Sequence, residues 1–76
     1  MKTVTLISKD DCSLCDKALL TLEKIRKKKP FILDIKKIQP GTSDYDKYKE
    51  KIPVIYINNV RVFYYTINEQ TLLEML

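Results

Sequence analysis

Residues 4–15 read VTLISKDDCSLC and place a strand, a polar loop and the start of a helix in succession. The β-branched and apolar run at the beginning predicts a strand over about residues 3–8. From residue 13 to about residue 28 the apolar side chains recur at intervals of three and four, which predicts one buried face of a helix. The two cysteines of the chain, Cys12 and Cys15, therefore lie where the strand gives way to the helix.

Short apolar runs after this helix predict three further strands. Residues 31–35 have the length and content of a buried second strand, and residues 54–57 and 60–65 form a further pair. Asn58-Asn59 gives that pair a two-residue hairpin loop, because asparagine tolerates the positive φ that tight hairpin turns require. We expect the first two strands to be parallel, since a helix joins them, and the last two to be antiparallel.

Two more helices are predicted from capping residues and spacing. Turn-forming residues at 39–43 lead into a short helix with Tyr45, Tyr48 and Ile52 on one face. Asn68 can cap a last helix that runs to the C-terminus. The order β-α-β-α-β-β-α predicts an α/β fold with a four-stranded mixed sheet flanked by three helices, in one domain that spans all 76 residues.

Composition limits the function classes. The chain has no His, and 14 Lys and Arg against 10 Asp and Glu give a formal charge of +4. The missing His excludes His-based catalytic triads and Cys₂His₂ zinc fingers. The excess positive charge lies mostly in residues 24–29, which we interpret as a solvated helix end, so nucleic acid is not an expected partner. No secretory leader or long apolar segment stands in the sequence, and we expect a cytoplasmic protein without a membrane partner.

Cys12 and Cys15 are the one group of residues in the sequence whose types and spacing indicate a chemical function. At a helix start this spacing puts both sulfurs on one side, near enough to form a bridge. The helix N-terminus favours a thiolate at Cys12, and Cys15, one turn inward, is better placed to resolve a mixed disulfide. Asp11 or Ser13 is expected to cap the helix. A zinc site lacks further Cys or His ligands in this chain, whereas two unrelated core cysteines stay open as an alternative.

The charges around the cysteine pair oppose the effect of the helix end. Five charged residues lie within a few positions of it: Asp10, Asp11, Asp16, Lys9 and Lys17. Three negative and two positive charges leave a net charge of −1. We therefore expect a thiol pKa at Cys12 nearer to about 7 than to the value of about 3.5 that strong oxidants show.

The segment Ser8-Lys9-Asp10-Asp11-Cys12-Ser13-Leu14-Cys15 resembles the active-site segment of glutaredoxins, which carry a Lys three residues before the first Cys of C-P-Y-C. Residues 51–58, KIPVIYIN, look like their T-V-P-x-I-F-I-N segment. Closer still, C-x-L-C-D with a short tail resembles the compact glutaredoxin-like family of thioredoxin-fold proteins. The resemblance implies a thioredoxin-like fold and a thiol–disulfide oxidoreductase of cell redox homeostasis and electron transport.

The resemblance also implies roles for particular residues. Cys12 would be the nucleophile and Cys15 the resolving thiol of a redox-active disulfide. A cis Pro53 would face this pair, and the backbone of Ile52 would pair with the substrate as a short antiparallel strand. The implied substrate-binding residues are Lys9, Ser13, Leu14, Ile52 and Pro53. Without the resemblance, Pro53 is simply a proline at the first residue of a strand.

The chain departs from glutaredoxins where they bind glutathione. Residues 63–66, FYYT, replace the G-G-x-D segment, and Leu14 and Lys51 replace a Tyr and a Thr. Either Phe63 and Tyr64 narrow the glutathione groove, or they alternate across the strand with one in the core. In both cases we expect protein disulfides as substrates and weak use of glutathione. The expected protein is a monomer without a tightly bound cofactor, reduced by glutathione or by a thioredoxin-reductase-type protein.

Two other function classes stay open at this point. In the first, two chains and glutathione would share an iron–sulfur cluster through Cys12, which would make the protein a carrier. In the second, the protein would be a non-catalytic adaptor that uses the basic residues 24–29 to bind RNA or an acidic protein.

Overall fold

The computed structural model describes residues 1–64 and 67–76. The elements, in chain order, are β1 (Thr3–Ser8), α1 (Ser13–Lys28), β2 (Ile32–Lys37), α2 (Ser43–Tyr48), β3 (Val54–Ile57), β4 (Val60–Tyr64) and α3 (Glu69–Met75). This order confirms the predicted one. Tyr65, which the sequence places at the end of the last strand, lies outside the described residues.

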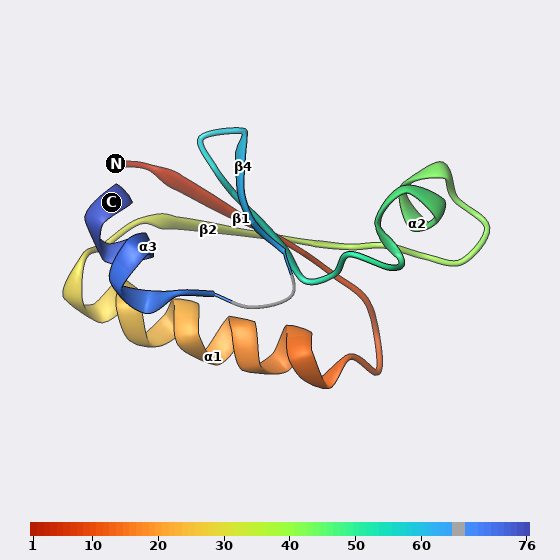
Figure 1. The fold of residues 1–76 in the computed structure, drawn as a ribbon, viewed down its shortest axis with the longest axis horizontal. Coiled ribbons are helices and arrows are strands. Elements are labelled where there is room, and N and C mark those ends of the chain that lie inside the picture. The colour runs from red at the N-terminus through yellow and green to blue at the C-terminus, as the bar shows by residue number, and fades with distance from the viewer. Residues whose placement is uncertain (65–66) are drawn as a thin grey trace.

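The four strands form one mixed sheet in the order β2-β1-β3-β4 (Figure 1). β1 and β2 are parallel, while β1 with β3 and β3 with β4 are antiparallel, as predicted for the first and last pairs. Asn58 and Asn59 connect β3 to β4 with φ angles of 49° and 70°, which confirms the tight hairpin turn. The carboxyl end of the central strand β1 leads directly into the loop that carries Cys12.

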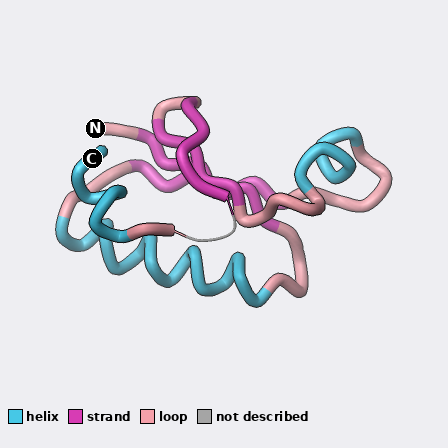
Figure 2. Tube along the Cα trace, in the orientation of Figure 1, coloured by secondary structure: helices cyan, strands magenta, loops and turns pink. Residues whose placement is uncertain are grey.

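α1 and α3 cover one face of the sheet (Figure 2). The side chains between these helices and the sheet form the main hydrophobic core: Val4, Leu6, Ala18, Leu22, Ile25, Phe31, Ile55, Ile57 and Leu72. They come from all parts of the chain, so α1 is fixed against the sheet along its length. The orientation of its first turn, which holds the cysteine pair, follows from this packing.

α2 lies beyond the ends of the strands rather than over the sheet (Figure 1). Thr42 caps it, because its hydroxyl accepts a hydrogen bond from the backbone N–H of Tyr45 at 3.2 Å. Ile52 was predicted on this helix and is not, since α2 ends at Tyr48 and Ile52 directly precedes the bend at Pro53. The sheet face opposite α1 and α3 is therefore covered by side chains, not by a helix, in the described part of the chain.

The prediction of a buried second strand is wrong. Phe31 is buried but precedes β2, and within the strand Ile32 is 52% exposed and Ile35 is 43% exposed. The reason is that β2 lies at the edge of the sheet, where it has a neighbouring strand on one side only. An apolar run of this length has the same pattern in an edge strand as in a central one.

Candidate active site

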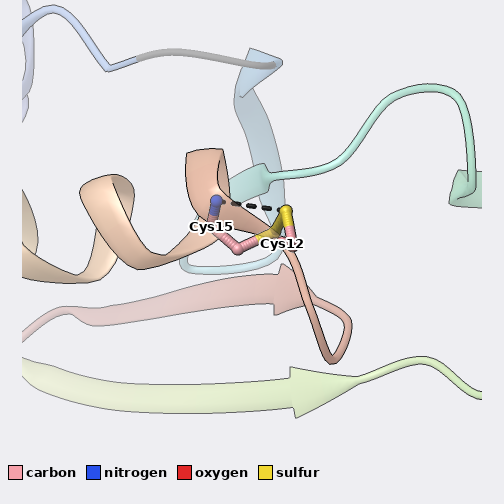
Figure 3. Close-up of a disulfide and its surroundings, with 2 residues drawn as sticks. All are labelled: Cys12 and Cys15. Carbon is pink, nitrogen blue, oxygen red and sulfur yellow. Dashed lines mark hydrogen bonds between the residues drawn. A yellow bond between two sulfur atoms is a disulfide. The ribbon is translucent and has the colours of Figure 1, made fainter.

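The two cysteines form a disulfide at the N-terminus of α1 (Figure 3). Their Cα atoms lie 5.2 Å apart, within the usual range for a bridge. Cys12 itself is the N-cap, and its sulfur accepts a hydrogen bond from the backbone N–H of Cys15 at 3.1 Å. Asp11 and Ser13, the caps expected from the sequence, do not fill this position. A sulfur seldom caps a helix, and standard capping preferences favour oxygen-bearing side chains.

Burial differs between the two cysteines as predicted. Cys15 is only 3% exposed and belongs to a second hydrophobic cluster, whereas Cys12 is half-buried at the edge of that cluster. Solvent and a substrate therefore reach the sulfur of Cys12 more readily than that of Cys15. The rest of the cluster consists of Ile7, Ile38, Ile52 and Val54.

The loop before Cys12 holds a charge arrangement that the sequence did not reveal. Asp10 forms an ion pair with Lys37 of β2, at 3.2 Å between carboxylate oxygen and Nζ. Lys37 is 25 positions away from Cys12 along the chain, so a count of local charges misses it. With Lys37 included, the three carboxylates near the cysteine pair face three cations, and the net local charge of −1 becomes zero.

Asp11 stands in the left-handed region of backbone conformation, with φ at 55°. Aspartate is one of the few residues other than glycine that visit this region without a large cost. The turn at Asp11 brings the chain from β1 into α1 and sets the direction in which Cys12 enters the helix. Its carboxylate is exposed beside the cysteine pair.

Ile52 and Pro53 are joined by a cis peptide bond, which confirms the expected isomer. Ile52 shares the second hydrophobic cluster with Cys15, and Figure 3 shows the segment that leads into β3 passing beside the bridge. The backbone N–H of Ile52 donates to the carbonyl of Tyr48 at 3.1 Å. This N–H is therefore engaged within the protein, and the pairing of the Ile52 backbone with a substrate strand stays a prediction.

The other residues expected at the site lie around the cysteines. Ser13 and Leu14 occupy the exposed first turn of α1, and Leu14 is 43% exposed. Lys9, Asp10 and Asp11 line two pockets, with volumes of about 330 and 270 Å³. Cys15 also lines the larger pocket. These positions leave Lys9, Ser13 and Leu14 accessible to a molecule that reaches Cys12.

Phe63 and Tyr64 turn to opposite faces of the sheet, as in the second alternative drawn from the sequence. Phe63 packs against the main core beneath α1 and α3. Tyr64 packs against the second cluster, which contains Cys15. Phe63 therefore does not narrow a glutathione groove beside Cys12. Of these two residues, only Tyr64 is placed where it could do so.

Four tyrosines pack against the second cluster, and three of them were not expected at the site: Tyr45, Tyr48 and Tyr56. The hydroxyl groups of Tyr48 and Tyr56 lie 2.9 Å apart. This hydrogen bond lowers the pKa of Tyr48, an effect that Lys47 reinforces, and it raises the pKa of Tyr56. These residues can be recognised only from the folded structure, because they come from two separate elements, α2 and β3, and meet in one cluster.

Two findings concern cofactors and membranes. Over residues 1–64 and 67–76, no three or more Cys, His, Asp or Glu side chains gather in a way that could hold a metal ion. Within the same residues, no helix combines the length and the apolar composition that crossing a bilayer requires.

The chain combines a four-stranded mixed sheet, a bridged Cys-x-x-Cys at the start of the first helix and a cis proline directly before β3. These features define a redox module of the thioredoxin superfamily. The model of the family described as Glutaredoxin-like domain (DUF836) matches residues 3–76. The chain belongs to this family, and its fold is thioredoxin-like. A comparison with curated protein sequences finds no match.

Proposed function

We propose that the protein catalyses thiol–disulfide exchange, with Cys12 as the attacking thiol and Cys15 as the resolving thiol. The observation that carries the proposal is the asymmetry of the bridge at the start of α1, where Cys15 is 3% exposed and Cys12 is accessible. The hydrogen bond from the Cys15 N–H to the Cys12 sulfur supports it, because such a bond favours a thiolate. Membership of the glutaredoxin-like family supports it as well.

The exchange proceeds in two steps. The thiolate of Cys12 attacks one sulfur of a substrate disulfide, the substrate S–S bond breaks, and the other substrate sulfur leaves as a thiolate. Cys15 then loses its proton and attacks the Cys12 sulfur of the mixed disulfide, which expels the second substrate thiolate and forms the Cys12–Cys15 bridge. Two electrons pass from the protein to the substrate, and the two substrate thiolates take up the two protons of the former dithiol.

A reductant closes the cycle. Two glutathione molecules, or a dithiol protein of the thioredoxin-reductase type, reduce the Cys12–Cys15 bridge by the same chemistry in reverse. The protein works as a monomer in this scheme, since both sulfurs come from one chain. Protein disulfides are the proposed substrates, with Lys9, Ser13, Leu14, Pro53 and the carbonyl of Ile52 around the reacting sulfurs.

A redox titration against glutathione and dithiothreitol buffers tests the proposal. We expect an intramolecular disulfide with a midpoint potential of roughly −200 to −270 mV, in the range of cytosolic reductants. A pair that never bridges under any buffer would contradict the two-step exchange.

The use of glutathione is tested separately. Tyr64 occupies a position where the glutaredoxin motif has glycine, so we expect slow turnover of a glutathione mixed disulfide and efficient reduction of a protein disulfide. Tyr64→Gly should raise the turnover of the glutathione substrate, whereas Phe63→Leu, on the other face of the sheet, should not. Turnover by the unaltered protein at the rate of a dithiol glutaredoxin would contradict weak glutathione use.

A further inference from the structure

A β-bulge in β4 brings two side chains together that a regular strand would separate. Val54 pairs with Tyr64, whereas Tyr56, two residues later in β3, pairs with Arg61, three residues earlier in β4. Side chains alternate between the faces of a regular strand, so residues three apart point to opposite sides. The extra residue in β4 places Arg61 and Tyr64 on the same face, and bulges commonly redirect side chains in this way next to active sites.

Two cations lie against the ring of Tyr64. The guanidinium carbon of Arg61 is 4.5 Å from the ring centroid, and the Nζ of Lys51 is 5.5 Å from it. Cation–π contacts hold these groups in place and leave their positive charges intact. Over residues 1–64 and 67–76, the ion pairs join other residues, and neither Lys51 nor Arg61 has a carboxylate within ion-pairing distance.

This pair of cations lies on the sheet face opposite α1 and α3, at the end of the sheet nearest the cysteine bridge. Tyr64 packs against the second hydrophobic cluster, which includes Cys15 and Ile52. Lys51 directly precedes Ile52 in the sequence. A polypeptide that presents a disulfide to Cys12 beside Ile52 therefore passes near Lys51, and Arg61 lies over the same tyrosine ring as Lys51.

The charge of this sheet face is positive at the end near the cysteines. Lys36 of β2 pairs in register with Ile7, which in turn pairs with Val54, so Lys36 lies in the same row as Tyr64. Among the described strand residues that the register places on this face, Asp34 of β2 carries the negative charge. Two strands, β1 and β3, separate β2 from β4. Charge complementarity thus favours an acidic partner on this surface.

An acidic polypeptide fits the surface better than a nucleic acid does. Proteins that bind single-stranded nucleic acids offer aromatic rings on which bases stack. Here Lys51 and Arg61 already lie over the ring of Tyr64, and Lys47 lies 5.2 Å from the ring centroid of Tyr48. The cations can therefore form ionic contacts with a partner, whereas the rings of Tyr48 and Tyr64 are already in contact with cations and do not offer a free face for base stacking.

We propose that Lys51 and Arg61, which both lie over the ring of Tyr64, bind acidic side chains that flank the reactive cysteine of a protein disulfide substrate. The inference rests on the thiol–disulfide exchange proposed above, because that exchange supplies the substrate. It adds the chemical class of the substrate, which is an acidic polypeptide. Long-range attraction of this kind raises association rates and is screened by salt.

The experiment uses three peptides of identical length, each with one cysteine and each oxidised to its symmetric disulfide. The residues beside the cysteine are Glu in the first peptide, Gln in the second and Lys in the third. We expect the reduced protein to reduce the Glu peptide about tenfold faster than the Gln peptide at low salt, and the Lys peptide slowest. The order should collapse toward equal rates in about 0.5 M salt, where the Debye length is only a few ångströms.

Matched variants identify the surface. Changing Lys51→Gln and Arg61→Gln together should bring the ratio of the Glu and Gln rates close to one. Changing Lys27→Gln and Lys28→Gln together removes the same charge at the far end of α1, and the ratio should stay near ten. A ratio that survives the first pair of changes, or equal rates for all three peptides in the unaltered protein, would overturn the proposed surface.

A binding measurement separates this inference from the proposed exchange. Fluorescently labelled peptides with Ser in place of the cysteine are titrated with the protein, beside a single-stranded oligothymidylate. We expect the Glu peptide to bind most tightly, and the changes at Lys51 and Arg61 to weaken it. Binding of this kind without reduction of any peptide would contradict the exchange and leave the surface standing. Tighter binding of the oligonucleotide, lost on changing Arg61, would replace the acidic polypeptide by a nucleic acid.

Discussion

The sulfur of Cys12 accepts the backbone N–H of Cys15 and stands at the positive end of α1. Both features favour the thiolate once the bridge is reduced, so we expect a Cys12 thiol pKa below its ordinary value of about 8.5. The position of the sulfur could be predicted from the Cys-x-x-Cys spacing at a helix start. Its role as the cap, and the Asp10–Lys37 ion pair beside it, depend on contacts that a local sequence pattern does not contain.

Removing the carboxylate next to Cys12 should lower this pKa further. Asp11→Asn keeps a residue that tolerates the left-handed backbone at φ 55° and takes away a negative charge that opposes the thiolate. We expect the Cys12 pKa to fall by a few tenths of a unit, measured from the pH dependence of thiolate absorbance in the reduced protein. Asp44→Asn, in the first turn of α2, is the control and should leave the pKa unchanged. A rise in the Asp11→Asn protein would contradict this electrostatic account.

The two hydrogen-bonded tyrosines should titrate in a fixed order. Their hydrogen bond lowers the pKa of Tyr48 and raises the pKa of Tyr56, so Tyr48 should lose its proton first as the pH rises. Tyr56→Phe removes the donor that favours the Tyr48 phenolate, and the pKa of Tyr48 should rise toward its ordinary value. NMR titration of ring-labelled tyrosine resolves the individual residues. A Tyr48 titration that does not move in this variant would count against the hydrogen bond.

At the scale of elements, the cap of α3 was predicted and the cap of α1 was not. Asn68 caps α3 as expected, with its side-chain oxygen accepting the N–H of Thr71 at 3.0 Å. The edge position of β2 and the early end of α2 could not be predicted, because both depend on which elements lie next to them in space. The bulge in β4 is a third such case, since it depends on how β4 pairs with β3.

The hairpin turn between β3 and β4 offers a matched pair of substitutions. Both asparagines have positive φ, which glycine adopts readily, but only Asn58 also accepts the backbone N–H of Thr3, at 2.9 Å. Asn58→Gly should cost about 1 kcal/mol in the free energy of unfolding, because it removes that acceptor. Asn59→Gly should change it by less than about 0.5 kcal/mol or increase stability slightly. Urea denaturation measures both, and equal losses would show that the Asn58 contact is not stabilising.

In the whole molecule, the core that stabilises the fold and the cluster that holds the redox pair are two separate groups of residues. The main core lies under α1 and α3, and the second cluster, with Cys15 in it, lies toward the open end near α2. The amphipathic pattern of the helices predicted the main core. The second cluster draws on residues from distant segments, so the sequence indicated its cysteines and its proline but not the tyrosines that complete it.

This separation predicts that a core substitution destabilises the protein without changing the reactivity of the thiols. Leu22 is fully buried in the main core, and Leu22→Ala should lower the free energy of unfolding by about 2–5 kcal/mol. The alkylation rate of Cys12 in the reduced, folded protein should stay within about twofold of the original, because Leu22 lies outside the second cluster. A loss of stability below about 1 kcal/mol would contradict the placement of Leu22 at the centre of the core.

The measurement that tests the central claim most directly is the capture of a protein disulfide substrate by two single-cysteine variants, followed by intact-mass spectrometry. Cys15→Ser keeps the attacking thiol and lacks the resolving one, so it should accumulate a mixed disulfide through Cys12. Cys12→Ser keeps only the buried thiol and should form none on the same timescale. Equal capture by the two variants, or capture through Cys15 alone, would contradict the assignment of Cys12 as the nucleophile.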